Sequence, residues 1–473
     1  MRLPPRIRLL LPAMMDSTPA VDLDLIRRYN QPGPRYTSYP TAPHFSHDYD
    51  ATDFARDLAA ADTDTPLSLY VHLPFCRSLC YYCGCHMKVT QRADSIQRYV
   101  DALKQEIDQM AALVSAERPV VQMHWGGGTP TYLTAEQIRD LGTHIRRRFR
   151  VADDAEISIE ADPRGLTEDR VAAAAEVGFN RMSVGVQDVN RVVQEAINRI
   201  QPTETVAQAL RWAREYGFEG LNVDLVYGLP HQTPERFQHT LDVVDRLQPD
   251  RIALYSYAHV PSIKKHQRVI DEDALPVPET KLRLFKQGLE HLTARSGYRF
   301  IGMDHFARPT DALARAQDTG DLHRNFQGYS TRADAEVVAF GVSGISQLRG
   351  AYAQNVKALP AYYEQVANEN APTVFRGVRL SPEDQLRRHV IMQLMCNFHL
   401  DKAAVAERFE IDFDDVFADA WARLSLLEAD GLLIRTENAL HVQPPGRLLI
   451  RNIARAFDAY CDHADHPVHA QTV

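Results

Sequence analysis

The chain has 473 residues, and its 53 lysines and arginines against 62 aspartates and glutamates give a formal net charge of −9 with histidine counted as neutral. Hydrophobic residues make up 45% and charged residues 24%, ordinary values for a globular enzyme that exclude a disordered or collagen-like chain. The acidic net charge argues against nucleic-acid binding. No run of about 18 apolar residues occurs, so a membrane-spanning helix is not predicted.

The first residues, MRLPPRIRLLLPAMMD, contain three arginines and a short leucine run. A secretory signal is not predicted, because the apolar stretch is short, is interrupted by prolines and precedes no small-residue cleavage site. We interpret residues 1–21 as a disordered or mis-annotated start, with Met14 or Met15 the more natural first residue, and we expect a cytoplasmic protein. Residues 22–67 are expected to form an N-terminal extension that covers the functional site.

One unit recurs between residues 68 and 258: a short apolar, β-branched run followed by an amphipathic stretch with helix-start chemistry. Thr134 and Gln137 have capping-box spacing, and Thr233 precedes a proline at the first helical position. Repeated strand-helix order predicts parallel strands joined by right-handed crossovers. The predicted strands are 68–75, 120–125, 156–161, 181–186, 221–228 and 251–257, and the predicted helices are 94–114, 134–149, 167–177, 203–217 and 233–248.

Polar or unusual residues follow each of these strands at its C-terminal end. Four cysteines follow the first strand and Gly126–Thr129 the second; Glu160, Gln187, Asp224 and the pair Tyr257 and Ala258 follow the others. In a β/α barrel the active site is built from these strand ends, so the pattern favours a partial or full barrel over a doubly wound sheet.

The second half of the chain is less regular. A strand is predicted at 298–303, and residues 304–330 are expected to form a long functional loop because their periodicity is weak. We therefore expect a barrel with loop insertions over residues 68–365 and a mainly helical domain over 366–473. That domain begins at the cap Ser381 and ends in a pattern resembling a winged helix, which we interpret as a packing or lid element because it lacks a basic stripe.

Four of the six cysteines fall within ten positions, as Cys76, Cys80, Cys83 and Cys85. Such a cluster in a cysteine-poor chain indicates a metal site or catalysis rather than a disulfide framework. The spacing favours an iron–sulfur centre over zinc, because structural zinc sites usually take two short cysteine pairs set well apart. Zinc or a redox function remains an alternative on spacing alone. His72 and His124, inside strands, are expected to be hydrogen-bonded core histidines.

The pattern C-x₃-C-x₂-C after the first strand of a β/α series resembles the radical S-adenosylmethionine (SAM) superfamily. The full pattern C-x₃-C-x₂-C-x-C is similar to that of the oxygen-independent coproporphyrinogen III oxidases within it. The resemblance covers residues 22–461 and is carried by further motifs, which are GPRYTSYPTA (33–42), HWGGGTPTYL (124–133), EISIEADPR (156–164), GVQD (185–188), GMDHFARP (302–309), HRNFQGYST (323–331) and GRLLIRNIA (446–454).

This resemblance implies an anaerobic oxidative decarboxylation in haem biosynthesis that converts two propionates of coproporphyrinogen III into the vinyl groups of protoporphyrinogen IX. It implies a [4Fe–4S] cluster and SAM, which together generate a 5′-deoxyadenosyl radical that abstracts a propionate β-hydrogen. An unactivated C–H bond is beyond an ordinary side-chain base, so a radical cofactor is chemically reasonable. An electron donor and an electron acceptor are also implied, and we expect a monomer with no nucleic-acid or membrane partner.

By the same resemblance, Cys76, Cys80 and Cys83 hold the cluster, whereas Cys85 is an additional cysteine that is a catalytic candidate or a packed loop thiol. Positions matching contacts to the cluster-bound SAM are Tyr70, Gly127, Glu160 and Ile345. A second SAM is implied beside the first, and the positions matching its surroundings are Tyr82, Gly128, Thr129, Gln187, Arg199, Asp224 and Ala258.

The substrate carries four carboxylates and requires cationic partners. Arg35, Arg308, His323 and Arg324 lie in the matching motifs and are candidates, with loop-anchoring ion pairs as the alternative. Two other readings of the whole chain stay open: a related radical SAM protein that binds haem, which typically lacks Cys85 and the 33–42 motif, and a zinc-binding interaction module with a winged-helix tail.

Overall fold

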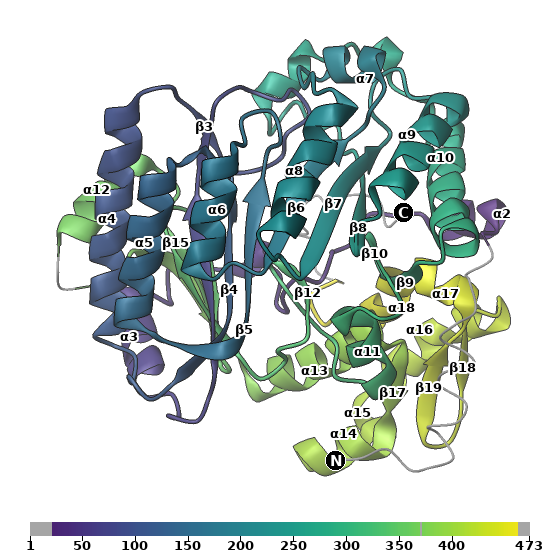
Figure 1. Cartoon of the computed structure of the whole chain (residues 1–473). Helices are drawn as coiled ribbons and strands as arrows, with labels where there is room; N and C mark the ends of the chain where they lie inside the picture. Colours follow the sequence, from purple (N-terminus) through teal and green to yellow (C-terminus); the bar gives the residue numbers. More distant parts are fainter. Residues whose placement is uncertain (1–20, 369–370, 462–473) are drawn as a thin grey trace. The chain divides into compact units, whose positions relative to one another are not determined.

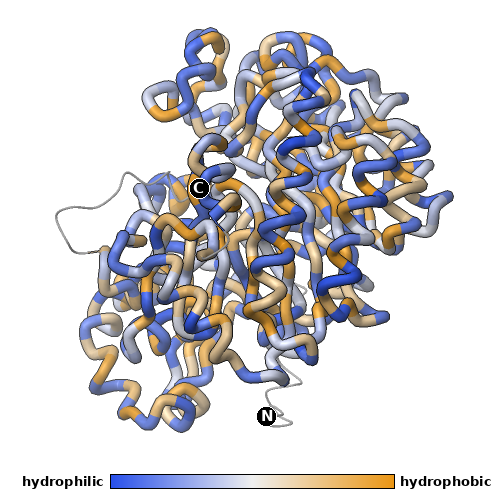
Figure 2. Tube along the Cα trace, turned by 90° about the vertical axis from the view of Figure 1, so that its left-hand side faces the viewer, coloured by the Kyte–Doolittle hydropathy of each residue, from blue (hydrophilic) through white to orange (hydrophobic). Residues whose placement is uncertain are grey.

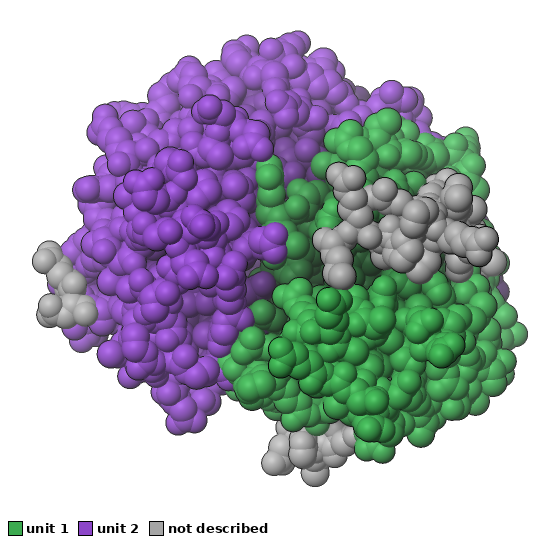
Figure 3. Space-filling model, turned by 90° about the horizontal axis from the view of Figure 1, so that it is seen from below, with its two compact units in different colours: residues 1–44, 285–333, 380–473 green, residues 45–284, 334–379 purple. Residues whose placement is uncertain are grey.

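The computed structural model describes residues 21–368 and 371–461. The chain divides into two compact units, each assembled from separate segments (Figure 3). Unit 1 comprises residues 1–44, 285–333 and 380–473, and unit 2 comprises residues 45–284 and 334–379. The domain boundaries expected from the sequence, at 67/68 and 365/366, divide the chain into consecutive segments and stay a prediction. The interpretation of residues 1–21 as a disordered or mis-annotated start concerns residues that, except for Val21, lie outside the described part of the chain.

Unit 2 is built on six parallel strands that pair in sequence order, which confirms the predicted α/β architecture. The strand order does not close into a ring, so the sheet has the form of a partial barrel. The parallel strands are β1 (Leu67–Leu73), β4 (Pro119–Gly127), β5 (Arg150–Ala161), β6 (Arg181–Gln187), β7 (Gly220–Tyr227) and β8 (Arg251–Ser256).

Helices cover the outer face of this sheet, and Figure 1 shows α4, α5, α6 and α8 lying side by side along the strands. Hydrophobic and hydrophilic residues alternate along their turns (Figure 2), as expected for helices with one buried face. The helices of unit 2 are α3 (Ala51–Ala59), α4 (Ala93–Ala111), α5 (Ala135–Arg148), α6 (Glu168–Val177), α7 (Arg191–Ala196), α8 (Thr203–Glu215), α9 (Pro234–Leu247) and α12 (Leu359–Ala367), and α10 (Pro278–Glu290) continues into unit 1.

The helix starts follow the predicted capping chemistry. Thr134 accepts from the backbone N–H of Gln137, whose side chain accepts from the N–H of Thr134, so the capping box before α5 is complete. Thr233 accepts from the N–H of Arg236, with Pro234 at the first helical position of α9. These caps satisfy N–H groups that have no partner inside the helix and fix where each helix begins after its strand.

The sheet continues beyond β1 through four strands that were not predicted. β13 (Glu336–Phe340) pairs parallel to β1, and β14 (Ile345–Gln347), β15 (Ala351–Asn355) and β16 (Val374–Arg379) follow antiparallel. All five residues of β13 are buried, so its sequence lacks the alternation that marks a half-exposed strand. Short elements complete the unit: β2 (Phe75–Cys76), β3 (Lys88–Val89), and single turns at Pro130–Tyr132, Lys265–Val269 and Glu272–Ala274.

Unit 1 corrects one expectation. Residues 304–330 do not form a long irregular loop but contain β10 (His305–Ala307), α11 (Ala312–Thr319) and a hairpin of β11 (His323–Asn325) and β12 (Gly328–Ser330). The elements are short, so neither periodicity extends over enough residues to be recognised. The predicted strand at 298–303 is present as β9 (Arg299–Gly302), paired antiparallel with β10. The unit also contains α2 (Leu23–Tyr29) and turns at Ala42–His44 and His291–Arg295.

The C-terminal segment is mainly helical, as predicted, and begins with the capped helix α13 (Pro382–Asn397) after Ser381. Its small antiparallel sheet has the order β17-β19-β18, with α16 preceding the β18–β19 hairpin. The elements are β17 (His399–Asp401), α14 (Lys402–Phe409), α15 (Phe413–Val416), α16 (Ala418–Ala429), β18 (Leu433–Arg435), β19 (Ala439–Val442), α17 (Pro444–Leu448) and α18 (Ile450–Arg455). Over residues 21–368 and 371–461, none of the helices combines the length and apolar character needed to cross a membrane.

Candidate active site

A cavity of about 540 Å³ lies in unit 2 at the C-terminal ends of the parallel strands. The four clustered cysteines and the polar strand-end residues line it together, as the parallel strand order requires. Of the predicted site residues, those on the cavity wall are Cys76, Cys80, Tyr82, Cys83, Cys85, Gly127, Gly128, Thr129, Glu160, Gln187, Arg199, Asp224 and Ala258.

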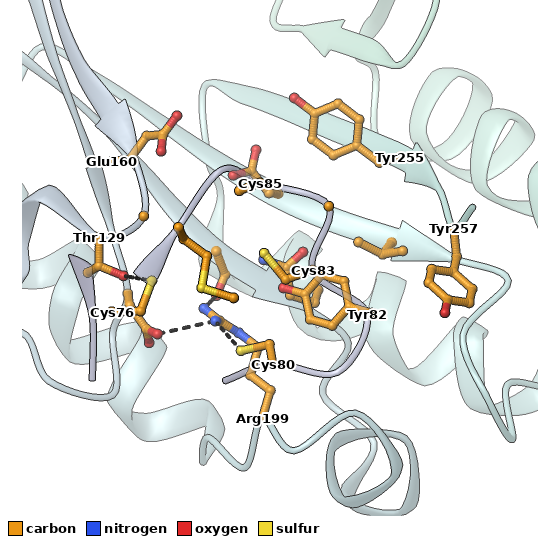
Figure 4. A pocket seen from close by; sticks show the side chains of 18 of the residues that line it. Cys76, Cys80, Tyr82, Cys83, Cys85, Thr129, Glu160, Arg199, Tyr255 and Tyr257 are labelled. Atoms are coloured by element: carbon orange, nitrogen blue, oxygen red, sulfur yellow. Dashed lines mark hydrogen bonds and ion pairs between the residues drawn. The ribbon is translucent and has the colours of Figure 1, made fainter. Parts of the chain in front are cut away.

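The cysteines belong to the loop that follows β1. Cys76 ends β2, Cys80 is 8% exposed, and all four thiols are free of disulfides. Figure 4 shows Cys76, Cys80 and Cys83 around one part of the cavity. Burial raises the pKa of the Cys76 thiol to about 11, so this group requires a positively charged partner to act as a thiolate at neutral pH.

Two arginines contact Cys80. Arg164 Nη2 lies 3.3 Å and Arg199 Nη1 3.5 Å from its Sγ, and both guanidinium groups also pair with Asp162, at 2.6 and 3.2 Å. Arg199 additionally donates to the carbonyl oxygen of Gly185 at 2.8 Å. Asp162 therefore fixes both cations beside the Cys80 thiol.

Cys85 is an exposed residue on the same loop, close to Cys83. Its interaction with the Cys83 thiol is the main cause that lowers the pKa of Cys83 to about 6. Cys85 therefore lies next to Cys76, Cys80 and Cys83 but does not belong to the C-x₃-C-x₂-C motif that these three residues form. Its role as a catalytic candidate stays a prediction.

The glycine-rich end of β4 passes close to the strand before the cysteine loop. Gly127 has φ of +115°, and a Cβ there would lie 2.5 Å from Cε1 of His72; at Gly128 it would lie 2.6 Å from the backbone of Pro74. Only glycine permits this conformation and this approach. The backbone of β4 therefore reaches the cavity wall at Gly127 and Gly128.

Glu160 projects from β5 into the cavity. Its carboxylate accepts from the backbone N–H of Gly127 at 3.1 Å and from His124 Nε2 at 3.3 Å, while His124 Nδ1 contacts Ser158 Oγ at 2.6 Å. Burial opposes ionisation, but these hydrogen bonds outweigh it and lower the pKa of Glu160. The group is thus an ionised acceptor suited to an ammonium ligand.

Asp224, on β7, has the opposite electrostatic behaviour. Burial, followed by the nearby charge of Glu160, raises its pKa to about 6, although Ser183 and Asn222 donate to it at 3.2 and 2.9 Å. A carboxyl group with a raised pKa on a cavity wall is characteristic of a functional site. Next to it, Gln187 at the end of β6 adopts φ of +66°, a left-handed conformation uncommon outside glycine.

An apolar and aromatic wall faces these polar groups. Tyr82, Tyr255, Tyr257 and Val226 line the cavity, and they belong to a cluster with Ile270 and neighbouring buried residues. Aromatic faces of this kind can hold a planar or heterocyclic ligand.

Two predicted residues lie off the cavity wall. The hydroxyl of Tyr70, within β1, is 3.0 Å from His72 Nδ1. Ile345 lies on β14 and is half-buried opposite Gln354. His72 donates to the carbonyl oxygen of His86 in the cysteine loop and His124 contacts Ser158 Oγ on β5, so both histidines are hydrogen-bonded, as expected.

The substrate-carboxylate candidates lie in unit 1 and differ from one another. Arg308 stacks 4.1 Å from the Tyr298 ring centre and donates to a backbone carbonyl, and Arg35 pairs with Asp304. His323 is kept neutral, because burial lowers its pKa to about 4.

Arg324, by contrast, is 3% exposed, and its Nε and Nη1 have no hydrogen-bond partner among the described residues. Its guanidinium lies 4.9 Å from the Tyr329 ring centre, but this contact leaves the two nitrogens without hydrogen bonds. Since buried, unsatisfied guanidinium nitrogens are costly, Arg324 has the strongest requirement for an anion among the four candidates.

Comparison with known proteins supports one family. Residues 70–244 match the family described as the Radical SAM superfamily, and residues 380–449 match the HemN C-terminal domain. The oxygen-independent coproporphyrinogen III oxidase of Escherichia coli strain K12 is 49% identical over 439 residues, which cover 93% of this chain and 95% of that protein. The chain belongs to the oxygen-independent coproporphyrinogen III oxidase family.

Other members of this family agree with that assignment. The oxidase of Synechocystis is 46% identical over 454 residues, covering 94% of this chain and 97% of that protein. A solved structure titled as the radical SAM enzyme coproporphyrinogen III oxidase (HemN) from Escherichia coli superposes with a TM-score of 0.90 at 47% identity, covering 94% of this chain and 100% of that one. The predicted family and the predicted α/β fold with a helical C-terminal region are confirmed.

Membership in the oxidase family brings a [4Fe–4S] cluster and SAM as cofactors, and the cavity fits both. Three free thiols from one loop line it, and thiolates are the usual ligands of iron–sulfur clusters. Arg199 is 6% exposed and its Nε has no hydrogen-bond partner among the described residues, so it is available to a polar ligand. The arrangement does not resemble a zinc site with two separated cysteine pairs.

Sequence reasoning missed several residues of the oxidase cavity. Asp162 and Arg164 belong to the motif EISIEADPR but were not predicted as site residues, and neither were Tyr255, Lys264 and Gln267. The Asp-Pro-Arg run directly after β5 is a signal that could have identified the first two. No comparable signal marks Gln267, which follows an irregular stretch after β8.

Proposed function

We propose that the chain catalyses the oxygen-independent oxidative decarboxylation of coproporphyrinogen III to protoporphyrinogen IX in haem biosynthesis. The observation that carries the proposal is the joint lining of one cavity by three free, closely spaced thiols and by residues at the ends of the parallel strands β1 and β4 to β8. The family relationship supplies the reaction, and the cavity supplies a place where cluster, SAM and a reacting carbon could meet.

Cys76, Cys80 and Cys83 would hold the cluster. When bound, the reduced cluster and SAM supply a 5′-deoxyadenosyl radical that can abstract hydrogen from an unactivated carbon. The chain's own contribution around these thiols is to place two cationic groups beside them, because Arg164 and Arg199 lie within 3.5 Å of Cys80 Sγ. Asp162 keeps both guanidinium groups in position.

Glu160 and the backbone of Gly127 would bind the amino-acid part of the cluster-bound SAM. The ionised carboxylate of Glu160 suits the ammonium group, and its hydrogen bond with the Gly127 N–H fixes its orientation. Tyr70, on β1, and Ile345, on β14, are proposed as further SAM contacts because they match contact positions in the family. A second SAM is proposed near Tyr82, Gly128, Thr129, Gln187, Arg199, Asp224 and Ala258, all on the cavity wall.

The residues excluding water from the reacting group would be the aromatic ones. Each propionate loses one hydrogen atom, one CO₂ and one further electron to become a vinyl group, so an electron acceptor is required in addition to the donor.

Tyr255, Tyr257 and Val226 offer an apolar wall against which a pyrrolic ring of the substrate can pack. Arg324 is proposed as a carboxylate-binding residue of unit 1, because its buried Nε and Nη1 have no partner among the described residues.

We also propose a cytoplasmic monomer whose partners are the substrate, an electron donor and an electron acceptor, without a nucleic-acid partner. The acidic net charge of −9 supports the last point. Size-exclusion chromatography with light scattering would test the monomer, and a molar mass of twice that of the chain would refute it.

The decisive experiment is anaerobic purification and reconstitution followed by incubation with coproporphyrinogen III, SAM, a reductant and cell extract as a source of the acceptor. We expect an iron–sulfur absorption spectrum, formation of methionine and 5′-deoxyadenosine, and protoporphyrinogen measured as protoporphyrin after oxidation. A colourless protein with stoichiometric zinc would refute the radical chemistry. SAM cleavage with tight haem binding but no porphyrin product would instead favour a haem-binding relative.

A further inference from the structure

A second cavity, of about 520 Å³, borders the cysteine loop in unit 2 and shares Ser78, Thr129, Asp162 and Arg164 with the first. Arg77 and Ser78, which lie between Cys76 and Cys80, form part of its wall. Ser78 also lines the cavity that contains the thiols. The two cavities therefore share the loop that carries the proposed cluster ligands.

The second cavity is polar and positively charged. Three arginines, Arg77, Arg164 and Arg170, line it together with a single carboxylate, Asp162, and no Leu, Ile or Val side chain contributes to the wall. Asp162 is already paired with Arg164 and with Arg199, which lines the first cavity. The remaining charge is therefore positive, which suits an anionic group and not the apolar ring system of a porphyrinogen.

Two side chains in this cavity have unused hydrogen-bonding capacity. Arg77 is exposed and makes no hydrogen bond or ion pair within the described part of the chain. Thr131 is only 2% exposed, yet its hydroxyl has no partner among the described residues. Because buried hydroxyl groups are normally hydrogen-bonded, Thr131 has unused capacity to bond a polar group at this cavity.

The wall of this cavity contacts the proposed cluster ligands directly. Thr129 Oγ1 lies 3.5 Å from Cys76 Sγ, and Arg164 Nη2 lies 3.3 Å from Cys80 Sγ. A group bound in the cavity is thus separated from two thiols by single side chains. The family reaction consumes an electron from an external donor, and the donor must come close to the cluster to deliver it.

We propose that this cavity is the docking point of the electron donor, a one-electron carrier protein with an acidic surface, one of whose carboxylates enters between Arg77 and Arg170. The reduced carrier loses one electron and the oxidised cluster gains it, so no further reactant is needed. Electron-transfer complexes bury little surface and depend on complementary charge, which a small basic cavity can provide. The proposal rests on the assignment of Cys76, Cys80 and Cys83 as cluster ligands.

The test measures cluster reduction and not porphyrin formation. A flavodoxin in its hydroquinone form serves as the acidic carrier, and the fading of the cluster's visible absorption is followed by anaerobic stopped flow in the reconstituted full-length protein. We compare the unaltered chain, Arg77→Glu, Arg170→Gln and the control Arg191→Glu, whose side chain is 64% exposed and absent from both cavity walls. Dithionite, a small reductant that needs no docking surface, is used in parallel.

We expect Arg77→Glu to raise the half-saturating flavodoxin concentration by about tenfold at low salt, with a difference that shrinks as salt is added. Arg170→Gln should have a smaller effect in the same direction, and Arg191→Glu should stay within about twofold. Reduction by dithionite should be unchanged in all variants. Equal flavodoxin dependence in Arg77→Glu and the unaltered chain would overturn the proposal, and so would an equal loss with dithionite. Because coproporphyrinogen is not added, failure of the proposed function would not alter this result.

Discussion

The side-chain amide of Gln267 donates to the carbonyl oxygen of Tyr82 at 3.1 Å, which ties an irregular segment after β8 to the cysteine loop. The same amide donates to Ala258 at 3.3 Å, and its oxygen accepts from the N–H of Val260 at 2.6 Å. Gln267 is 1% exposed, so these bonds are protected from water.

Two neighbours extend this arrangement. Lys264 Nζ donates to the carbonyl oxygen of Cys85 at 3.0 Å, and His266 Nε2 donates to that of Cys83 at 2.8 Å. Three side chains within four residues therefore hold consecutive parts of the loop through its carbonyl groups. We infer that this segment positions the loop and so preserves the geometry of the thiols.

Replacing Gln267 by glutamate should weaken this support, because a carboxylate cannot donate to the two carbonyl groups. Loss of buried hydrogen bonds of this kind costs about 1–2 kcal/mol, so we expect iron release to a chelator to accelerate by about tenfold. The exposed neighbour Lys265 provides a matched control, and Lys265→Gln should release iron at the unaltered rate. A Gln267→Glu variant that is fully folded by circular dichroism and keeps its iron normally would contradict the positioning role.

The parallel sheet and its helices could be predicted from sequence because each element is long enough to show one period and because caps such as Thr134 mark the starts. The strand ends that form the cavity could be predicted as well, since parallel order alone brings Glu160 and Asp224 to one edge. The contacts of Gln267 could not, because they join segments that are distant in sequence and carry no periodic signal. The same reason applies to β13, whose fully buried residues lack alternation.

Separate alanine substitutions should distinguish the cysteines. Cys80→Ala should lose nearly all reconstituted iron and SAM cleavage, because a three-thiolate site cannot hold the cluster with two. Cys85→Ala should retain both, since Cys85 lies close to Cys83 but outside the proposed ligand set. Iron and labile sulfide analysis after anaerobic reconstitution is the measurement. Full iron in Cys80→Ala, or none in Cys85→Ala, would show that the ligand assignment is wrong.

Arg324 and Arg308 should respond differently to substitution by glutamine. If Arg324 binds a substrate carboxylate, Arg324→Gln should raise KM for coproporphyrinogen III by about tenfold or more, with little change in kcat. Its unfolding free energy should not fall, because the substitution removes a buried guanidinium that has two nitrogens without partners among the described residues.

Arg308→Gln is the comparison. Its guanidinium stacks on Tyr298 and donates to the carbonyl oxygen of Ser296, so the variant should lose about 1 kcal/mol of stability and keep its KM. Urea unfolding and steady-state kinetics on the same preparations provide both readings. Destabilisation of Arg324→Gln with an unchanged KM would assign that residue a structural role.

Asp224 should make the stability of the cofactor-free chain depend on pH. Burial and the charge of Glu160 raise its pKa in the folded chain to about 6, well above the usual value of an aspartate, so folding favours the protonated carboxyl group. Its contribution to stability is complete below pH 4 and is lost as the pH rises towards 6 and beyond, because the ionised form is disfavoured in the fold.

Asparagine at position 224 removes this titration. When the pH is raised from 4.5 to 7.5, the unfolding free energy of Asp224→Asn should therefore rise by about 1–2 kcal/mol relative to that of the unaltered chain, after allowance for the partial exposure of Asp224. Urea unfolding at the two pH values measures the difference, and Asp101→Asn on the exposed face of α4 should show no such trend. An equal effect of Asp224→Asn at both pH values would mean that this carboxyl group ionises normally in the folded chain.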